Sequence, residues 1–131
     1  MRLAIDTNAY VAVCKGSPHA IAVMRRATAI LVPFVVVAEL RAGFACGTRT
    51  TRNEQMLTRF LNTERVGILY ADDQTSHHYA RLYYQLRRQG TPIPANDLWI
   101  AALVSQHTLT LLSTDRHFTH LPQLPLVREP R

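Results

Sequence analysis

Short apolar runs alternate along the chain with longer segments in which apolar residues recur at helical spacing. The apolar runs have the length of buried strands and predict strands at residues 3–5, 29–32, 66–69 and 109–113, with a fifth at 126–127. The periodic segments predict a helix that begins at Ser17-Pro18 and further helices at 34–45, 51–64, 72–89 and 96–107. Gly90 is expected to end the helix at 72–89.

This alternation of strand and helix is typical of a parallel sheet with helices on both faces. We therefore expect an α/β fold with three layers, α/β/α, around a central parallel sheet of four to five short strands. The length of 131 residues suits one domain, which we expect to occupy residues 1–131. In open parallel sheets, ligands bind beyond the carboxyl ends of the strands. Functional residues are thus expected directly after the predicted strands.

The net positive charge of the chain gives a first indication of the kind of partner that it binds. Fifteen basic and nine acidic residues give a formal net charge of +6 and a pI near 10.0. Fourteen of the basic residues are arginines, whose guanidinium groups bind phosphate in a bidentate manner. The charge favours a polyanionic partner, although a bias toward arginine also follows from genome composition. The candidate phosphate contacts, each with a solvated helix face as the alternative, are Arg49, Arg52, Arg59, Arg87 and Arg88.

Neither a membrane span nor a secretion signal is expected. No apolar run approaches the roughly 20 residues that cross a bilayer. Asp6 interrupts the amino-terminal stretch in which a signal peptide requires apolar residues. The chain has two cysteines, Cys14 and Cys46, which do not suggest a disulfide framework. We therefore expect a cytoplasmic protein with reduced cysteines and no membrane contact.

Four of the nine acidic residues lie at strand ends or on apolar helix faces. Asp6 directly follows the first predicted strand, and Asp115 comes two residues after the fourth. Glu39 lies inside the helix after the second strand, at a position where an apolar residue is expected. Asp97 opens its helix, and the residues three, four and seven positions further on are all apolar, so Asp97 shares the buried face.

Taken singly, each of these acids has an ordinary structural interpretation. Asp6 could accept hydrogen bonds in a strand-to-helix turn, and Glu39 could pair with Arg41 or another arginine. Asp97 and Asp115 could cap helix amino termini. Four acids at one sheet edge, however, destabilise the fold unless a cation neutralises them. Mg²⁺ and Mn²⁺ prefer oxygen ligands, and one or two such ions with a basic rim indicate phosphodiester hydrolysis.

Four segments of the chain resemble the acidic motifs of PIN-domain nucleases. They are Ile5-Asp6-Thr7-Asn8, Val36-Val37-Ala38-Glu39-Leu40-Arg41-Ala42-Gly43, Asn96-Asp97-Leu98-Trp99-Ile100-Ala101-Ala102 and Leu112-Ser113-Thr114-Asp115-Arg116-His117-Phe118. The motifs follow in order, and the resemblance spans residues 3–127. The chain length is also similar to that of VapC-type toxins of bacterial and archaeal toxin–antitoxin pairs.

The resemblance implies a PIN-like fold and a Mg²⁺- or Mn²⁺-dependent endoribonuclease. The implied ligands of one or two ions are Asp6, Glu39, Asp97 and Asp115, with Asp6 and Asp97 as the direct ligands. The implied supporting residues, whose side chains lie near these acids along the chain, are Thr7, Asn8, Ser113 and Thr114. The resemblance further implies an RNA substrate, a homodimer and a small VapB-like antitoxin that silences the enzyme.

Two other classes of function stay open. The chain could be a binding module that acts chiefly in a regulatory complex with a DNA-binding partner, an arginine of which would enter the acid pocket. A phosphatase or receiver-like domain also gathers aspartates at strand ends, but such phosphatases need an aspartate where this chain has Asn8. Zinc is not expected, because His107, His117 and His120 have no cysteine at zinc-binding spacing. We interpret His117 as a packed or solvated side chain.

Overall fold

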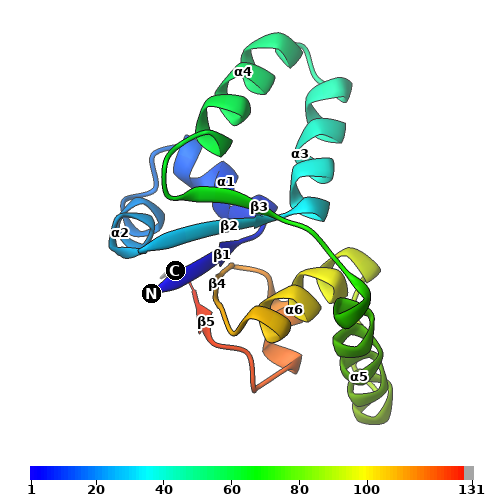
Figure 1. The fold of residues 1–131 in the computed structure, drawn as a ribbon. Coiled ribbons are helices and arrows are strands. Elements are labelled where there is room, and N and C mark those ends of the chain that lie inside the picture. Colours follow the sequence, from blue (N-terminus) through cyan, green and yellow to red (C-terminus); the bar gives the residue numbers. More distant parts are fainter. Residues whose placement is uncertain (129–131) are drawn as a thin grey trace.

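The structure, a computed structural model, describes residues 1–128 and shows strands and helices in alternation (Figure 1). The elements follow in the order β1 (Arg2–Ile5), α1 (Thr7–Cys14), α2 (Pro18–Arg26), β2 (Ala29–Pro33), α3 (Phe34–Cys46), α4 (Thr50–Leu61), β3 (Val66–Leu69), α5 (Asp73–Gln89), α6 (Ala95–His107), β4 (Thr110–Leu112), the short 3₁₀ helix η1 (Arg116–His120) and β5 (Leu126–Val127). All five strands predicted from the sequence are present.

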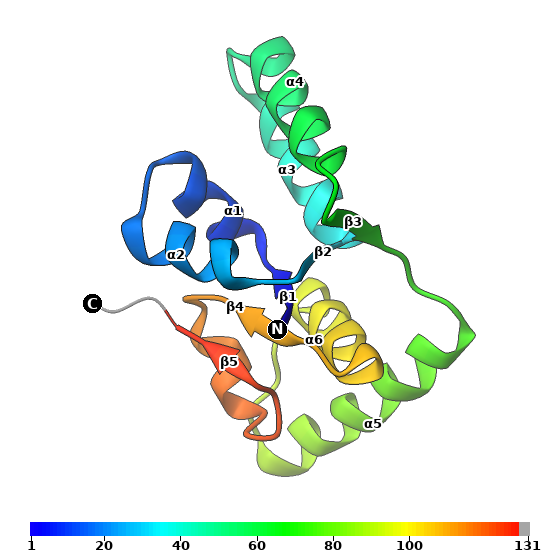
Figure 2. The same ribbon diagram turned by 60° about the vertical axis from the view of Figure 1, so that its left-hand side comes forward.

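Five parallel strands form the central sheet, in the order β3-β2-β1-β4-β5. Helices α1 to α4 cover one face of the sheet, whereas α5, α6 and η1 cover the other, as Figure 1 and Figure 2 both show. From β1, the chain adds β2 and β3 on one side of the sheet and then β4 and β5 on the other side. The predicted three-layer α/β/α fold with a central parallel sheet is confirmed.

The core lies on both faces of β1 and β4. The side chains of Leu3, Ile5 and Leu111 are fully buried, as are Ile100 of α6 and Phe118 of η1. Strands that are covered on both faces read as continuous apolar runs, and this explains why the sequence pattern located them. The carboxyl ends of β1 and β4 thus project from a closely packed and rigid sheet.

Helix α1, like the short 3₁₀ helix η1, was not predicted from the sequence pattern. Its eight residues, Thr7–Cys14, are mostly apolar, so they show little periodic contrast between a buried and an exposed face. The helix begins directly after β1 because Asp6 caps it, accepting a hydrogen bond from the Ala9 N–H at 2.8 Å. Asp6 therefore has a structural task in addition to any chemical one.

Helices α3 and α4 form a hairpin that stands away from the sheet (Figure 2). Leu57 of α4 is fully buried, and the Arg41 Nε donates to Glu54 Oε1 at 2.8 Å between the two helices. Cys14 and Cys46 are both free and exposed. Among the helices of residues 1–128, none is both long and apolar enough to cross a membrane.

Two glycine substitutions should change stability in opposite directions. Gly90 ends α5 in the left-handed conformation (φ 72°), where a side chain is strained, so we expect Gly90→Ala to lower the free energy of unfolding by about 1 kcal/mol. Gly43 lies within α3 with open space where a Cβ would be, so Gly43→Ala should raise it by about 1 kcal/mol. Urea unfolding of the two variants measures both changes. Shifts of the same sign would contradict this account.

Candidate active site

The register of β1 and β4 brings Asp6 and Ser113 side by side. Ile5 pairs with Leu112 in the parallel ladder, so the residue that follows each of them leaves the sheet at the same edge. The Ser113 hydroxyl donates a hydrogen bond to Asp6 Oδ2, while Asp6 Oδ1 accepts from the Ala9 N–H. Both Asp6 and Ser113 are buried. This end of the sheet therefore holds one carboxylate in a fixed orientation.

Asp115 enters the same site from the loop after β4. It caps η1, because its Oδ1 accepts a hydrogen bond from the His117 N–H at 2.9 Å. Its own N–H donates to Ser113 Oγ at 2.9 Å. Ser113 thus links two acids, since it donates to the carboxylate of Asp6 and accepts from the backbone of Asp115.

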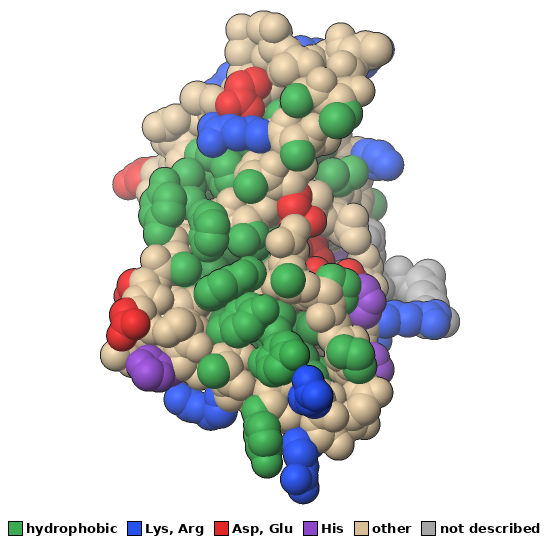
Figure 3. Space-filling view, turned by 90° about the vertical axis from the view of Figure 1, so that its right-hand side faces the viewer, with side chains coloured by type: hydrophobic (Ala, Val, Ile, Leu, Met, Phe, Trp, Pro, Cys, Tyr) green, Lys and Arg blue, Asp and Glu red, His purple; other side chains and the backbone are tan. Residues whose placement is uncertain are grey.

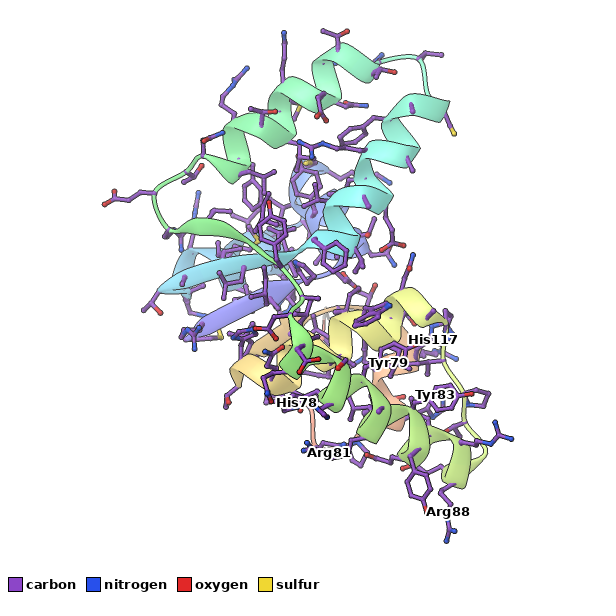
Figure 4. All side chains as sticks on the ribbon, turned by 45° about the vertical axis from the view of Figure 1, so that its right-hand side comes forward. His78, Tyr79, Arg81, Tyr83, Arg88 and His117 are labelled. Carbon is purple, nitrogen blue, oxygen red and sulfur yellow. The ribbon has the colours of Figure 1, made fainter. Side chains whose placement is uncertain are left out.

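Asp97 approaches from α6, on the second face of the sheet. The N-cap of α6 is Pro94, so Asp97 lies in the first turn and is not a helix cap. The rigid prolines before the helix explain why it begins at Ala95, slightly earlier than predicted. The His117 Nδ1 lies 2.7 Å from Asp97 Oδ2 and 3.0 Å from Asp115 Oδ1. In Figure 4, His117 lies at the end of α6 that carries Asp97.

Glu39 comes from α3, on the opposite face of the sheet from α6. The Thr7 hydroxyl donates to Glu39 Oε1 at 3.0 Å, so a residue of the first motif orients the acid of the second. The pairing of Glu39 with Arg41, considered from the sequence, is not formed, because Arg41 pairs with Glu54 instead. Helices α3 and α6 contact one another, and the negative charge of Glu39 contributes to raising the pKa of Asp97.

Burial and mutual repulsion change the proton affinity of these acids. Burial raises the pKa of Asp6 from its ordinary value of 3.8 to about 6; hydrogen bonds from Ser113 and the Ala9 N–H oppose the rise, and the charges of Asp115 and Asp97 add to it. The pKa of Asp97 is raised as well, mainly by burial, against the effect of its hydrogen bond with His117. Asp115 raises the pKa of both other aspartates. The carboxylates of the cluster therefore repel one another electrostatically.

The donor set suits a divalent cation. Asp97, Asp115 and His117 each offer one ligand atom, and these three atoms lie within 4.8 Å of one another. The carboxylate of Asp6, coupled electrostatically to both aspartates, adds a further oxygen donor from the neighbouring strand end. Concentrated carboxylate oxygens with raised pKa values are the chemistry that a bound cation relieves.

The four predicted supporting residues differ in whether they contact the acids. Thr7 and Ser113 both bond an acid of the cluster. Asn8 and Thr114 are exposed, and their side chains form no hydrogen bond within residues 1–128. The structure therefore brings two of the four predicted supporting side chains into direct contact with the acids and leaves two facing outward.

The five candidate arginines fall into two groups. Arg49 and Arg52 line a pocket of ≈ 470 Å³ between α1, α3 and α4, and Arg59 lies further along α4. Arg87 and Arg88 lie at the end of α5, where Arg88 is 5.9 Å from the ring centre of an exposed tyrosine, Tyr84. Among the described residues, none of the five forms an ion pair with the acid cluster.

His117 has contacts that the sequence did not predict. Its imidazole is partly exposed, in keeping with the interpretation as a packed or solvated side chain, but it also contacts two carboxylates. The reason is the turn of η1, in which the cap from Asp115 folds the following residues back toward α6. A histidine two residues after a capping aspartate was the signal available in the sequence.

One face of the molecule carries acidic side chains beside apolar surface. Figure 3 shows acidic and histidine side chains gathered next to a run of hydrophobic side chains. Tyr79 packs against Trp99 with ring centres 4.4 Å apart and against Tyr83 at 6.4 Å. Tyr83 and Tyr84 are half exposed or more.

Comparison with known proteins gives consistent matches over most of the chain. The PIN domain family model matches residues 3–124. Ribonuclease VapC1 of Haemophilus influenzae (strain R2866) is 35% identical over 113 residues, which cover 82% of this chain and 78% of that protein. Two solved structures, each covering 98% of both chains, are similar to the fold. They are VapBC-1 from nontypeable Haemophilus influenzae (TM-score 0.83, 26% identity) and VapBC2 from Rickettsia felis bound to a DNA fragment from their promoter (TM-score 0.84, 25% identity).

The sequence motifs, the strand order and the matches over nearly the whole length agree with one another. The acids of the four motifs come from the ends of β1 and β4 and from α3 and α6, which meet at one edge of the sheet. The family model covers all four of these acids. This chain therefore belongs to the PIN-domain family, among relatives that carry the name ribonuclease VapC.

Proposed function

We propose that this protein is a metal-dependent endoribonuclease and the toxin of a type II toxin–antitoxin pair. The observation that carries the proposal is the meeting of Asp6, Glu39, Asp97 and Asp115 at one edge of the sheet in a PIN-family chain. The name of its relatives, ribonuclease VapC, supports RNA as the substrate.

Each acid has a distinct task in this proposal. Asp6 and Asp97 bind Mg²⁺ or Mn²⁺, one or two ions, directly, and Glu39 and Asp115 complete the site. When bound, such an ion orients and activates a water molecule and offsets charge on the phosphate. Thr7 holds the Glu39 carboxylate in place, and Ser113 fixes Asp6 relative to the Asp115 backbone.

Within residues 1–128, no side chain is placed as a nucleophile at the site. Among the described residues, the hydroxyls of Thr7 and Ser113 both donate to carboxylates, which orients them as hydrogen-bond donors. Attack on phosphorus by an activated water is therefore the route that this arrangement supports. We assign the binding of RNA phosphates to the arginines of α4 and α5, which are Arg49, Arg52, Arg59, Arg87 and Arg88.

The partners follow from the similar structures. Both are named as VapBC, and this supports a small VapB-like antitoxin as the partner of this chain. The exposed tyrosines of α5, Tyr83 and Tyr84, support a homodimer. A single domain over residues 1–131 and a cytoplasmic location stay predictions of the sequence.

A second candidate is a binding module that acts in a regulatory complex. The Rickettsia felis VapBC2 structure contains promoter DNA, and this favours a regulatory role for similar complexes. In that case the acid cluster would receive a cationic side chain of the partner, and purified protein would bind that partner without cleaving RNA.

RNA cleavage with controlled metal supply separates the two candidates. Full-length protein freed of metal should cleave structured RNA after addition of Mg²⁺ or Mn²⁺, stop in excess EDTA, and recover when the ion is restored. Gel analysis of end-labelled RNA measures this. Cleavage that persists in EDTA would reject the metal-dependent mechanism, and the absence of cleavage under all conditions would favour the binding module.

A further inference from the structure

We propose that the His117 imidazole is itself a metal ligand and that it gives this site a preference for Mn²⁺ over Mg²⁺. The inference rests on the proposed function, because it assigns a nitrogen donor to the same cation site. The proposed ligand set differs from the four acids of the motifs, because those acids offer only oxygen atoms to the ion.

The spacing of the donor atoms carries the first step. The His117 Nδ1 lies 2.7 Å from Asp97 Oδ2 and 3.0 Å from Asp115 Oδ1. Ligands at about 2.1 Å from an octahedral ion are separated by roughly 3.0 Å along each edge of the octahedron. A single nitrogen at this distance from two carboxylates of different elements therefore has the spacing of ligands that share one ion.

The local fold holds the ring in this place. The His117 N–H donates to Asp115 Oδ1 at 2.9 Å, which ties the backbone of the histidine to the aspartate next to its ring. The next residue, Phe118, is fully buried and anchors η1 in the core. The imidazole is thus positioned by two contacts that do not depend on its own ring nitrogens.

The ring is also available for coordination. The His117 side chain is 43% exposed, so an ion can reach it from solvent. Within residues 1–128, Nε2 of His117 forms no hydrogen bond, so it can carry the ring proton when Nδ1, which pairs with the Asp97 carboxylate in this structure, binds an ion instead. Neutral imidazole with one free nitrogen is the form in which histidine binds metals.

The donor set predicts which ion is favoured. Mg²⁺ binds almost entirely through oxygen, whereas imidazole nitrogen is a good ligand for transition ions. Mn²⁺ shares the preference of Mg²⁺ for carboxylate oxygen but, as a first-row transition ion, accepts an imidazole nitrogen more readily than Mg²⁺ does. A site with Asp97, Asp115 and His117 should therefore bind Mn²⁺ more tightly than Mg²⁺, and the difference should come from the histidine.

Electron spin-echo spectroscopy of the Mn²⁺ complex tests the assignment directly. Full-length wild-type protein loaded with Mn²⁺ should show nitrogen modulation from a coordinated imidazole, and His117→Gln should lose it. His120→Gln, which changes an exposed histidine of the same short helix, is the matched control and should keep it. If His117→Gln does not fold, wild-type protein labelled with ¹⁵N-histidine replaces it, and its modulation should shift to the ¹⁵N pattern.

Calorimetry of metal binding supplies the second measurement. In His117→Gln, the dissociation constant for Mn²⁺ should rise by at least about tenfold, whereas that for Mg²⁺ should change by less than about threefold. Equal weakening for both ions would overturn the proposal, because it would mean that His117 only positions the carboxylates. A wild-type Mn²⁺ complex without nitrogen modulation would overturn it as well.

These outcomes are separable from those of the proposed function. Wild-type protein that cleaves RNA with Mn²⁺ but shows no nitrogen modulation would reject the histidine ligand and leave the ribonuclease intact. Wild-type protein with a coordinated imidazole but without any RNA cleavage would keep the ligand and reject the ribonuclease.

Discussion

Asp97→Asn is expected to lower metal-dependent RNA cleavage by at least about 100-fold while the protein stays folded. The substitution removes the charge and one ligand oxygen of the acid that lies between Asp115, Glu39 and His117. Folding should survive, because Asp97 does not cap its helix and its raised pKa shows that its charge is disfavoured in the folded state. The free energy of unfolding without metal should stay equal or rise.

Single-turnover cleavage at saturating Mn²⁺, together with thermal unfolding of the same preparations, measures both effects. Asp73→Asn is the matched control, since it makes the same chemical change at an exposed carboxylate on α5 and should keep full cleavage. Asp6→Asn should also lose cleavage and still fold, because asparagine caps helices as well as aspartate does. Cleavage within tenfold of wild type in Asp97→Asn would reject the assignment of the site.

Without metal, the free energy of unfolding should fall as the pH rises from about 4 to above 6. Asp6 has an ordinary pKa of 3.8 and a pKa of about 6 in the folded protein, so the folded state binds its proton more tightly than the unfolded state does. Stability from this group is complete below pH 3.8 and is lost as the pH rises through about 6. The difference in proton affinity corresponds to about 3 kcal/mol, and the raised pKa of Asp97 acts in the same direction.

Urea unfolding in EDTA between pH 4 and 7.5 measures this loss, and the comparison with Asp6→Asn isolates it. The variant has no proton to lose at that position, so its stability should fall less over the same range. Saturating Mn²⁺ should restore the stability of the wild type near neutral pH, because the ion replaces the proton. Identical pH profiles for wild type and Asp6→Asn would show that the burial of this carboxylate has no energetic consequence.

Much of the fold could be predicted from the local pattern of apolar and polar residues. The strands at Val66–Leu69 and Leu126–Val127 have the predicted bounds, and Gly90 ends α5 in the expected conformation. Such features depend on neighbours along the chain, namely apolar runs and a glycine in a left-handed turn. The sequence pattern did not predict helix α1, because a short, mostly apolar helix lacks the contrast between a buried and an exposed face on which periodicity depends.

The structure brings together the four acids that the sequence pattern named as candidates. Asp6 and Asp115 follow parallel strands, and the carboxyl ends of such strands lie at one edge of the sheet by necessity. Glu39 and Asp97 were selected because they lie on apolar faces of predicted helices, and those helices reach that edge from the two faces of the sheet. Strand ends and apolar helix faces together therefore selected these four from nine acidic residues.

What the sequence by itself determined is the order of elements, the layered fold and the acids that can meet. Only the tertiary structure decided the contacts between them: Ser113 between Asp6 and Asp115, Thr7 on Glu39, and His117 between two aspartates. The physical reason is that periodicity and strand ends are local properties of the chain. A hydrogen bond across 107 residues, such as that from Ser113 to Asp6, depends on the register of β1 against β4, which arises only when the sheet is packed.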